Sequence, residues 1–223
     1  LNTALLDACD AYAANLRVHF DHKMESLSED GSVTFVNTKD RSRRTVHARV
    51  VIGADGAYSA VRSSMLRLCR MDFERKYLRL GYKELNMPPA ADGSFVMPTA
   101  HALHIWPRSD FMLIALPNPD HTFTCTLFLG WETLEALEGD AAKARAFFQT
   151  HFPDALPLIA DFDAQWSSHP SSALVMVGVD PWNYGDKAVL IGDAAHATVP
   201  FYGQGANCAF EDCMVFNECL DAA

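Results

Sequence analysis

The chain has 223 residues, 49% of them hydrophobic and 21% charged, which is enough for one large domain or two small ones with a sizeable core. Its formal net charge of −10 argues against general nucleic-acid binding, which requires a basic surface. No apolar run approaches the ~18 residues of a membrane-spanning helix, so we expect neither a nucleic-acid partner nor membrane contact from this segment.

The six cysteines give no sign of a metal site. No pair has the CxxC spacing and no His-x3-His motif accompanies them, so we expect no bound metal. Five of the six lie in apolar stretches, and we expect these five to be small core residues in a reducing compartment. The basic cluster "RSRR" at residues 41–44 is interpreted as the solvated end of a hairpin.

The first part of the chain has the pattern of a helix followed by strands. Apolar residues at helical spacing predict a helix over residues 1–14, and strands are predicted within residues 16–30 and 32–38. The sequence begins and ends inside helical patterns, so we expect an internal part of a longer protein.

An apolar run at residues 46–52 predicts a strand buried on both faces, as in a parallel sheet. After "ADG", residues 57–66 predict a helix with Tyr58, Val61 and Met65 on one face.

Between residues 77 and 130 the pattern changes to short strands separated by Pro, Asn, Asp and Gly, which is typical of an antiparallel sheet. Helices over 131–138 and 141–151 and a strand over 171–178 follow.

A second strongly buried strand is predicted at residues 187–191, and a final helix is predicted from about Gly205, with Ala206, Phe210, Cys213 and Leu220 facing inward. Both buried strands, 46–52 and 187–191, end in a glycine that is followed within two residues by an aspartate. Ligands of open α/β sheets bind beyond the carboxyl ends of the strands, so we expect both turns to belong to one site.

The first turn, "GADGAYSAVR" at residues 53–62, has two interpretations. Asp55 could accept hydrogen bonds from a ligand hydroxyl while the helix start binds a phosphate, or Asp55 could simply cap the helix.

The second turn, "LIGDAAHATVPFYGQGANCAFED" at residues 190–212, is richer in special residues. Asp193 could hold the hydroxyls of a polyol, and the helix that starts after Gly203 and Gly205 could stabilise an anion or an electron-rich ring edge. The alternative is a helix cap with a glycine loop. We expect His196 to be structural, because no GxSxG elbow accompanies it; the GxGxxG fingerprint is also absent.

These two segments resemble the DG and GD motifs of the single-component aromatic flavoprotein hydroxylases, the class A flavin monooxygenases. Their order, with antiparallel strands between them, fits that family. The resemblance implies an α/β fold (α+β overall): an incomplete, Rossmann-like, three-layer FAD-binding fold with an inserted antiparallel-sheet substrate domain, similar to para-hydroxybenzoate hydroxylase. We expect residues 1–75 and 181–223 to form the FAD-binding part, and residues 76–180 the substrate part.

The resemblance also implies cofactors and site residues. FAD would perform the chemistry with NADPH as electron donor and O2 as co-substrate, and no side chain would act as a catalytic group. The positions that match flavin contacts of the family are Met24, Asp55, Gly56, Ala60, Gly192, Asp193, Gly205, Ala206 and Asn207. The positions that match the substrate pocket are Leu103, Met112, Ile114, Leu116, Thr126, Phe128, Pro200, Phe201 and Gln204.

Segments such as "GYKEL", "LHIWPR" and "HFPDALPLI" narrow the resemblance to family members that hydroxylate a small aromatic amino acid. The family's arginine and tyrosine that hold the amino-acid part of the substrate would lie upstream of Leu1. A hydroxylase of phenol or salicylate remains the alternative, as does an incomplete and inactive chain. A eukaryotic parent would lie on the mitochondrial outer membrane and a bacterial one in the cytoplasm.

Overall fold

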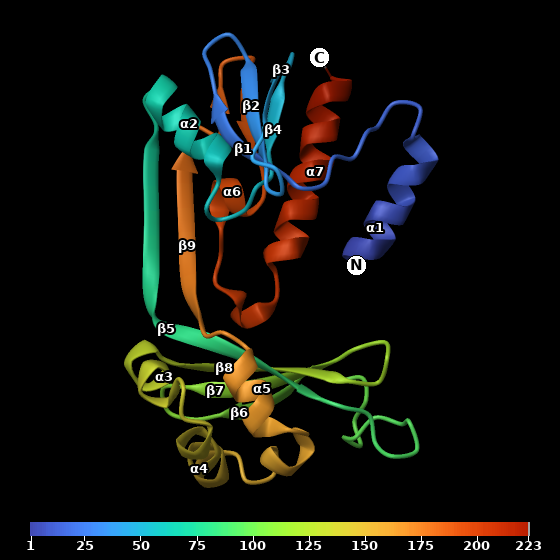
Figure 1. The fold of residues 1–223 in the computed structure, drawn as a ribbon, viewed down its shortest axis with the longest axis vertical. Helices are drawn as coiled ribbons and strands as arrows, with labels where there is room; N and C mark the ends of the chain where they lie inside the picture. Colours follow the sequence, from blue (N-terminus) through green and yellow to red (C-terminus); the bar gives the residue numbers. More distant parts are fainter. Residues whose placement is uncertain (223) are drawn as a thin grey trace. The chain divides into compact units, whose positions relative to one another are not determined.

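The computed structural model describes residues 1–222, which form two compact units (Figure 1). The first unit contains Leu1–Glu74, Val177–Ala197 and the chain from Gln204 onward, and the second contains Arg75–Met176 and Thr198–Gly203. From the sequence we predicted the boundaries between the two parts at residues 75/76 and 180/181. The structure also assigns Thr198–Gly203 to the second unit, because Phe201 packs on that unit's sheet.

The first unit begins with a helical segment and an antiparallel sheet. Helix α1 (Asn2–Cys9) and the 3-10 turn η1 (Asp10–Tyr12) have no buried residue. Strands β1 (His22–Leu27), β2 (Ser32–Asn37) and β3 (Arg43–His47) form the sheet in the order β1-β2-β3. Helix α2 (Ala60–Leu68) packs on β1, where the backbone N–H of Leu27 donates to Ser64 Oγ at 3.2 Å.

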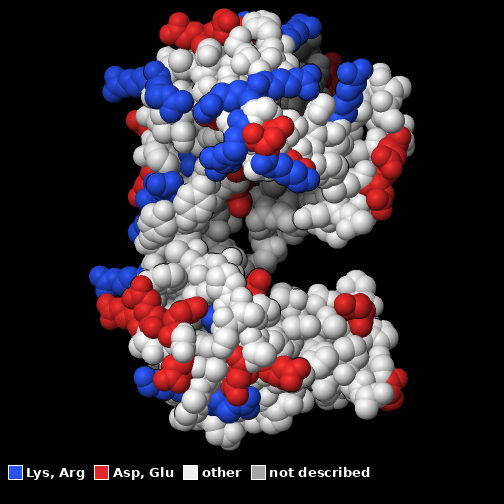
Figure 2. Space-filling model, in the orientation of Figure 1, with Lys and Arg blue, Asp and Glu red and all other residues white. Residues whose placement is uncertain are grey.

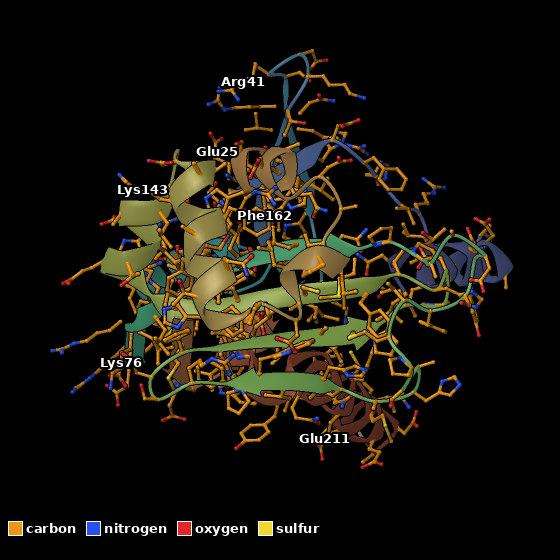
Figure 3. All side chains as sticks on the ribbon, turned by 90° about the horizontal axis from the view of Figure 1, so that it is seen from below. Glu25, Arg41, Lys76, Lys143, Phe162 and Glu211 are labelled. Atoms are coloured by element: carbon orange, nitrogen blue, oxygen red, sulfur yellow. The ribbon has the colours of Figure 1, made fainter. Side chains whose placement is uncertain are left out.

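The "RSRR" cluster lies at the turn between β2 and β3 and is exposed, as predicted. Arg41 has φ +63° at the tip of the turn and is labelled there in Figure 3. Arg43 donates two hydrogen bonds of 2.9 Å to the carboxylate of Glu25, and this contact lowers the pKa of Glu25. Figure 2 shows lysine and arginine side chains gathered on the visible face of this part of the chain.

A second small sheet in this unit contains the parallel pair. Its strands β10 (Asn183–Tyr184), β11 (Ala188–Leu190) and β4 (Val51–Gly53) have the order β10-β11-β4, and β11 runs parallel to β4. Gly53 is required at the end of β4, because a Cβ there would lie 2.8 Å from the Leu190 side chain and 2.9 Å from Val61.

The single buried strand predicted over 46–52 is wrong in two respects. The segment divides into the end of β3 and the start of β4, which belong to different sheets. Val46, Val50 and Ile52 are 38%, 47% and 48% exposed, because they line an open apolar cavity of about 550 Å³ instead of packing against another layer of residues 1–222.

The core of the first unit is centred on α2 and the strand ends. Val61 and Met65 are buried as predicted, but Tyr58 precedes the helix and is 61% exposed. Helix α7 (Gly205–Asp221) has no buried residue, so the predicted inward face is wrong: Phe210 and Leu220 are 43% and 59% exposed. The reason is that few described residues of this unit pack against α7 beyond its first turns.

The second unit contains an antiparallel sheet, as predicted, and helices cover one face of it (Figures 1 and 3). The strands of this sheet are β5 (Asp72–Met87), β6 (His104–Pro107), β7 (Met112–Pro117), β8 (Phe123–Gly130) and β9 (Ser172–Asp180), in the order β6-β7-β8-β5-β9. The first residues of β5 and the last residues of β9 belong to the first unit. The helices are α3 (Trp131–Leu137), α4 (Ala141–His151), η2 (Leu156–Leu158) and α5 (Phe162–Ser168).

Alternation along the strands separates the two faces of this sheet. Leu113, Phe123 and Leu127 point to the helices and are fully buried. Lys83 lies on the same side with no exposed surface. Its ammonium is 3.2 Å from a carboxylate oxygen of Glu138 and 4.5 Å from the ring centroid of Trp166. A buried charge is tolerated here because it is paired.

Most cysteines are less buried than predicted. Cys125 is fully buried, Cys213 and Cys219 are exposed, and the other three are intermediate. The three cysteines in the C-terminal segment lie on α7, whose burial the sequence overestimated. No helix within residues 1–222 has the length and apolar character needed to cross a bilayer.

Candidate functional site

The carboxyl ends of β4 and β11 open into a cavity of about 440 Å³ in the first unit. Most of the lining residues are glycine or alanine, which leaves room for a ligand against the backbone. The lining consists of Ala54, Gly56, Ile191, Gly192, Asp193, Gly205, Ala206, Ala209, Phe210 and Cys213. The structure thus brings together five of the predicted cofactor positions: Gly56, Gly192, Asp193, Gly205 and Ala206.

The turn after β11 is held by a carboxylate on α7. Gly192 adopts φ +60° and ψ −146°, a region that only glycine enters readily, and a Cβ there would lie 3.1 Å from Ala209 Cβ. Asp212 Oδ2 accepts from the backbone N–H of Gly192 at 2.6 Å and contacts His196 Nε2 at 2.6 Å. The His196 ring stacks on Trp182 with centroids 4.8 Å apart. His196 therefore has the structural role that we expected.

Asp193 places a negative charge beside the cavity, and the start of α7 places a partial positive charge beside the same cavity. The Asp193 side chain is exposed and makes no hydrogen bond or ion pair within residues 1–222. The first intrahelical donor of α7 is Cys208, whose N–H bonds to Gln204 O at 3.0 Å, and no acidic residue lies in the first turn. The amides before Cys208 therefore remain available for a ligand.

Asn207 lies on this first turn, but its side chain does not line the cavity. Its Nδ2 donates to Gln204 Oε1 at 2.9 Å, which joins two predicted site residues from either side of the helix start. The backbone N–H of Asn207, and not its side-chain amide, can then bind a ligand together with the other free N–H groups at the start of α7.

In the DG turn, one carboxylate oxygen of Asp55 caps the start of helix α2. Its Oδ2 accepts from the backbone N–H groups of Ala60 at 2.7 Å and Val61 at 3.2 Å. Asp55 and Met24 line the 550 Å³ apolar cavity, whereas Ala60 and Met24 line a third cavity of about 610 Å³. The structure therefore does not bring these three residues into the cavity beside Asp193, although Ala54 borders both of the first two cavities.

Arg62 connects the two motifs and was missed by the sequence interpretation. Its side chain is 2% exposed, and it donates to Ala194 O at 2.7 Å and to Ala57 O at 2.6 Å. The guanidinium lies 4.7 Å from the ring centroid of Phe73. An arginine in an otherwise small and apolar helix start was the available signal, because arginine is rarely buried without partners.

The predicted substrate residues of the second unit lie on the sheet face opposite the helices. The register pairs Met112 with Phe128 and Ile114 with Thr126, so the alternation read from the sequence is confirmed. Ile114 and Phe128 are only 6% and 3% exposed, and the Phe201 ring packs on Phe128 at 5.2 Å between centroids.

Other predicted substrate residues are much more exposed than Ile114 and Phe128. Leu116 shares the face but is 44% exposed, Leu103 is 45% exposed beside β6, and Pro200 is exposed next to Phe201. Gln204 belongs to the first unit. Residues of the same apolar cluster that the sequence interpretation missed are Leu78, Leu80, Tyr82 and Leu174. The alternation of β5 could have revealed the first three.

The family model described as "FAD binding domain" matches residues 1–222, and the chain belongs to this FAD-binding family. A curated kynurenine 3-monooxygenase from Anopheles gambiae is 43% identical over 221 residues, which are 98% of this chain and 45% of that protein. A second from Salinispora tropica is 46% identical over 211 residues, which are 93% of this chain and 46% of that protein. The chain thus spans about half the length of the curated relatives it matches.

Solved structures share the fold at low sequence identity. A mutant of 2-methyl-3-hydroxypyridine-5-carboxylic acid oxygenase superposes with a TM-score of 0.75 at 21% identity, over 97% of this chain and 56% of that one. Pseudomonas aeruginosa PqsL in complex with 2-aminobenzoylacetate gives a TM-score of 0.73 at 21% identity, over 98% of this chain and 57% of that one. The predicted FAD-binding α/β fold with an inserted antiparallel sheet is confirmed.

Proposed function

We propose that this chain is part of an FAD- and NADPH-dependent monooxygenase that converts L-kynurenine to 3-hydroxykynurenine with O2 as co-substrate, a step of tryptophan degradation. The observation that carries the proposal is the 43–46% identity to kynurenine 3-monooxygenases over nearly the whole chain. The structure supports it with a glycine- and alanine-lined cavity in one unit and an apolar sheet face in the other.

The cavity beside Asp193 fits a flavin cofactor. Small side chains allow a flat or extended group to lie on the backbone, the free amides of α7 suit an electron-rich ring edge, and the unpaired carboxylate suits polyol hydroxyls. Asp193, Gly192 and the backbone from Gly205 to Asn207 would therefore hold FAD, with Asp55, Gly56, Ala60 and Met24 toward its nucleotide end. When bound, FAD supplies the redox and oxygen-transfer chemistry.

The tasks of the protein are then positioning, water exclusion and charge stabilisation. The α7 dipole would stabilise negative charge that develops on a ring against its first turn. Ile114 and Phe128, with Met112 and Phe201 beside them, would hold the aromatic ring of the substrate and exclude water from it. The remaining contacts of this unit would come from Leu103, Leu116, Thr126 and Pro200.

The parent protein tests this proposal directly. Kynurenine-dependent NADPH oxidation, with 3-hydroxykynurenine identified by mass spectrometry, is the expected result. Turnover only with phenol or salicylate would show another aromatic hydroxylase of the same family.

The 223-residue chain alone is proposed to be inactive, since it spans about half of its relatives' length and its apolar cavity beside β4 is open. Flavin absorbance that survives desalting of the purified chain, together with NADPH-dependent turnover, would contradict this.

A further inference from the structure

The cavity beside Asp193 lies between two segments of the first unit. One wall is the turn after β11, which contributes Ile191, Gly192 and Asp193. The other wall is one side of α7, where the lining residues recur at helical spacing and are Gly205, Ala206, Ala209, Phe210 and Cys213. The width of the cavity is therefore set by the contacts that hold α7 against this turn.

The two walls approach each other closely beside Asp193. A Cβ on Gly192 would lie 3.1 Å from Ala209 Cβ, and a Cβ on Gly205 would lie 4.0 Å from Asp193 Oδ1. The Asp193 carboxylate thus lies near the first residue of α7. A small rotation of the turn would change the place of this carboxylate relative to both the helix and the cavity.

The side chain of Asp212 on α7 reaches back to this turn. Its Oδ2 accepts from the backbone N–H of Gly192 at 2.6 Å, although the two residues are 20 positions apart. Glycine has wide conformational freedom, so the turn needs an external contact to keep Gly192 at φ +60° and ψ −146°. The bond from Asp212 supplies that contact directly before Asp193, whose direction depends on it.

The same oxygen of Asp212 also holds the other end of the turn. It lies 2.6 Å from Nε2 of His196, the last residue of the short helix α6 (Asp193–His196). The His196 ring stacks on Trp182 at 4.8 Å between centroids, and Trp182 O accepts from the N–H of Leu190 in β11 at 2.8 Å. Helix α6 is thus fixed at both ends, and Asp193 is its first residue.

Asp212 and His196 make these contacts outside the cavity. Among residues 1–222 neither of them belongs to the cavity lining, and their side chains are 13% and 25% exposed. Hydrogen bonds in such a partly buried place are weakened little by water. The two residues are therefore placed to orient a binding residue, not to bind a ligand themselves.

We propose that Asp212 and His196 are a positioning pair for the cofactor. The pair directs the Asp193 carboxylate to the flavin hydroxyls and keeps the turn at a fixed distance from the free N–H groups at the start of α7. This inference rests on the proposed place of FAD in the cavity. The pair determines how tightly FAD binds and how the flavin is oriented, although neither side chain touches it.

Fluorescence titration of the apo form of the parent protein with FAD, well below the melting temperature of every variant, measures the effect. Asp212→Ala should weaken FAD binding about tenfold or more, because a misplaced binding group loses most of its contact. Asp212→Asn removes the charge but keeps an oxygen that accepts the Gly192 N–H, so its Kd should stay within about threefold of the wild type. Equal weakening by both variants would overturn the inference, because the charge and not the position would then matter.

A double-mutant cycle tests whether the two residues act as one unit. His196→Phe keeps a ring that can stack on Trp182 but has no donor for Asp212, and it should weaken FAD binding about threefold. The double variant should bind FAD no more weakly than Asp212→Ala, because the shared contact is already lost. Multiplication of the two effects, or an unchanged Kd for His196→Phe, would overturn the assignment of a pair.

Glu211→Gln is the matched control, because Glu211 is the exposed neighbour of Asp212 on α7, and its Kd should equal that of the wild type. Visible circular dichroism of the bound flavin separates positioning from folding stability. Asp212→Ala should change this spectrum at saturating FAD. A lower melting temperature with an unchanged Kd and an unchanged spectrum would show a purely structural role and overturn the inference.

The proposed function can fail separately. None of these measurements uses kynurenine, so the Kd values and the flavin spectrum still decide the inference if the wild type binds FAD without hydroxylating L-kynurenine.

Discussion

Asp212 holds the turn after β11 through a single carboxylate oxygen, so Asp212→Ala removes two hydrogen bonds at once. The N–H of Gly192 and the ring of His196 would lose their acceptor in a region where the side chains of His196 and Asp212 are only 25% and 13% exposed.

A hydrogen bond to a charged group contributes about 1.5–3 kcal/mol. Two such bonds sum to about 3–6 kcal/mol, and because His196 is partly solvated we reduce this sum by about a third and expect a loss of about 2–4 kcal/mol in the free energy of unfolding. For a chain of this size, about 2–4 °C of melting temperature corresponds to 1 kcal/mol, so the expected shift is about 5–15 °C.

Thermal melting of the 223-residue chain, followed by circular dichroism, measures the shift. Glu211→Ala removes the same charge from the neighbouring exposed position of α7 and serves as the control. Asp212→Asn should recover part of the loss, because an amide oxygen can still accept one bond. A melting temperature for Asp212→Ala equal to that of Glu211→Ala would refute the reasoning.

Asp193→Ala should weaken FAD binding by the parent protein about tenfold to hundredfold, because one charge-assisted contact to a hydroxyl is removed; flavin-fluorescence titration measures this, and an unchanged Kd contradicts the proposed role. Glu138→Ala should lower the free energy of unfolding by about 2–4 kcal/mol, because it leaves the buried Lys83 ammonium without its carboxylate partner. Adding Lys83→Met should restore most of that loss in urea denaturation, and a further loss would argue against the ion-pair explanation. Burial raises the pKa of Cys125 to about 12, so iodoacetamide at mildly alkaline pH should label the exposed Cys213 and not Cys125; equal labelling in a mass-spectrometric peptide map would show that the strand is not protected.

Local patterns predicted the second unit well because its contacts are mostly between neighbouring strands. The alternation of Met112, Ile114 and Leu116 places all three on one face whatever the neighbouring strands are, and the observed register agrees.

The first unit was predicted less well because its burial depends on distant partners. The apolar run at 46–52 indicated a buried strand, yet an apolar residue such as Ile52 carries no information about which chain segment covers it. The inward face predicted for α7 failed for the same reason.

Side-chain contacts to distant backbone groups were also beyond local prediction. Arg62 and Asp212 act through backbone groups far away in the sequence, and no spacing rule connects such groups. Asp193 and its neighbours could be predicted to share one site because the special turn residues are concentrated in one segment, and the structure places Gly192, Asp193, Gly205 and Ala206 around one cavity.

The bond from Arg62 to Ala194 spans 132 positions of the chain, and the antiparallel unit lies between them. Long-range pairings form slowly because the closure of a long loop is entropically unfavourable before any contact stabilises it. The inserted sheet is built mainly from neighbouring strands, so it can form first and shorten the effective loop that separates β4 from β11. Connectivity therefore favours an order of folding in which the inserted antiparallel sheet forms before β4 pairs with β11.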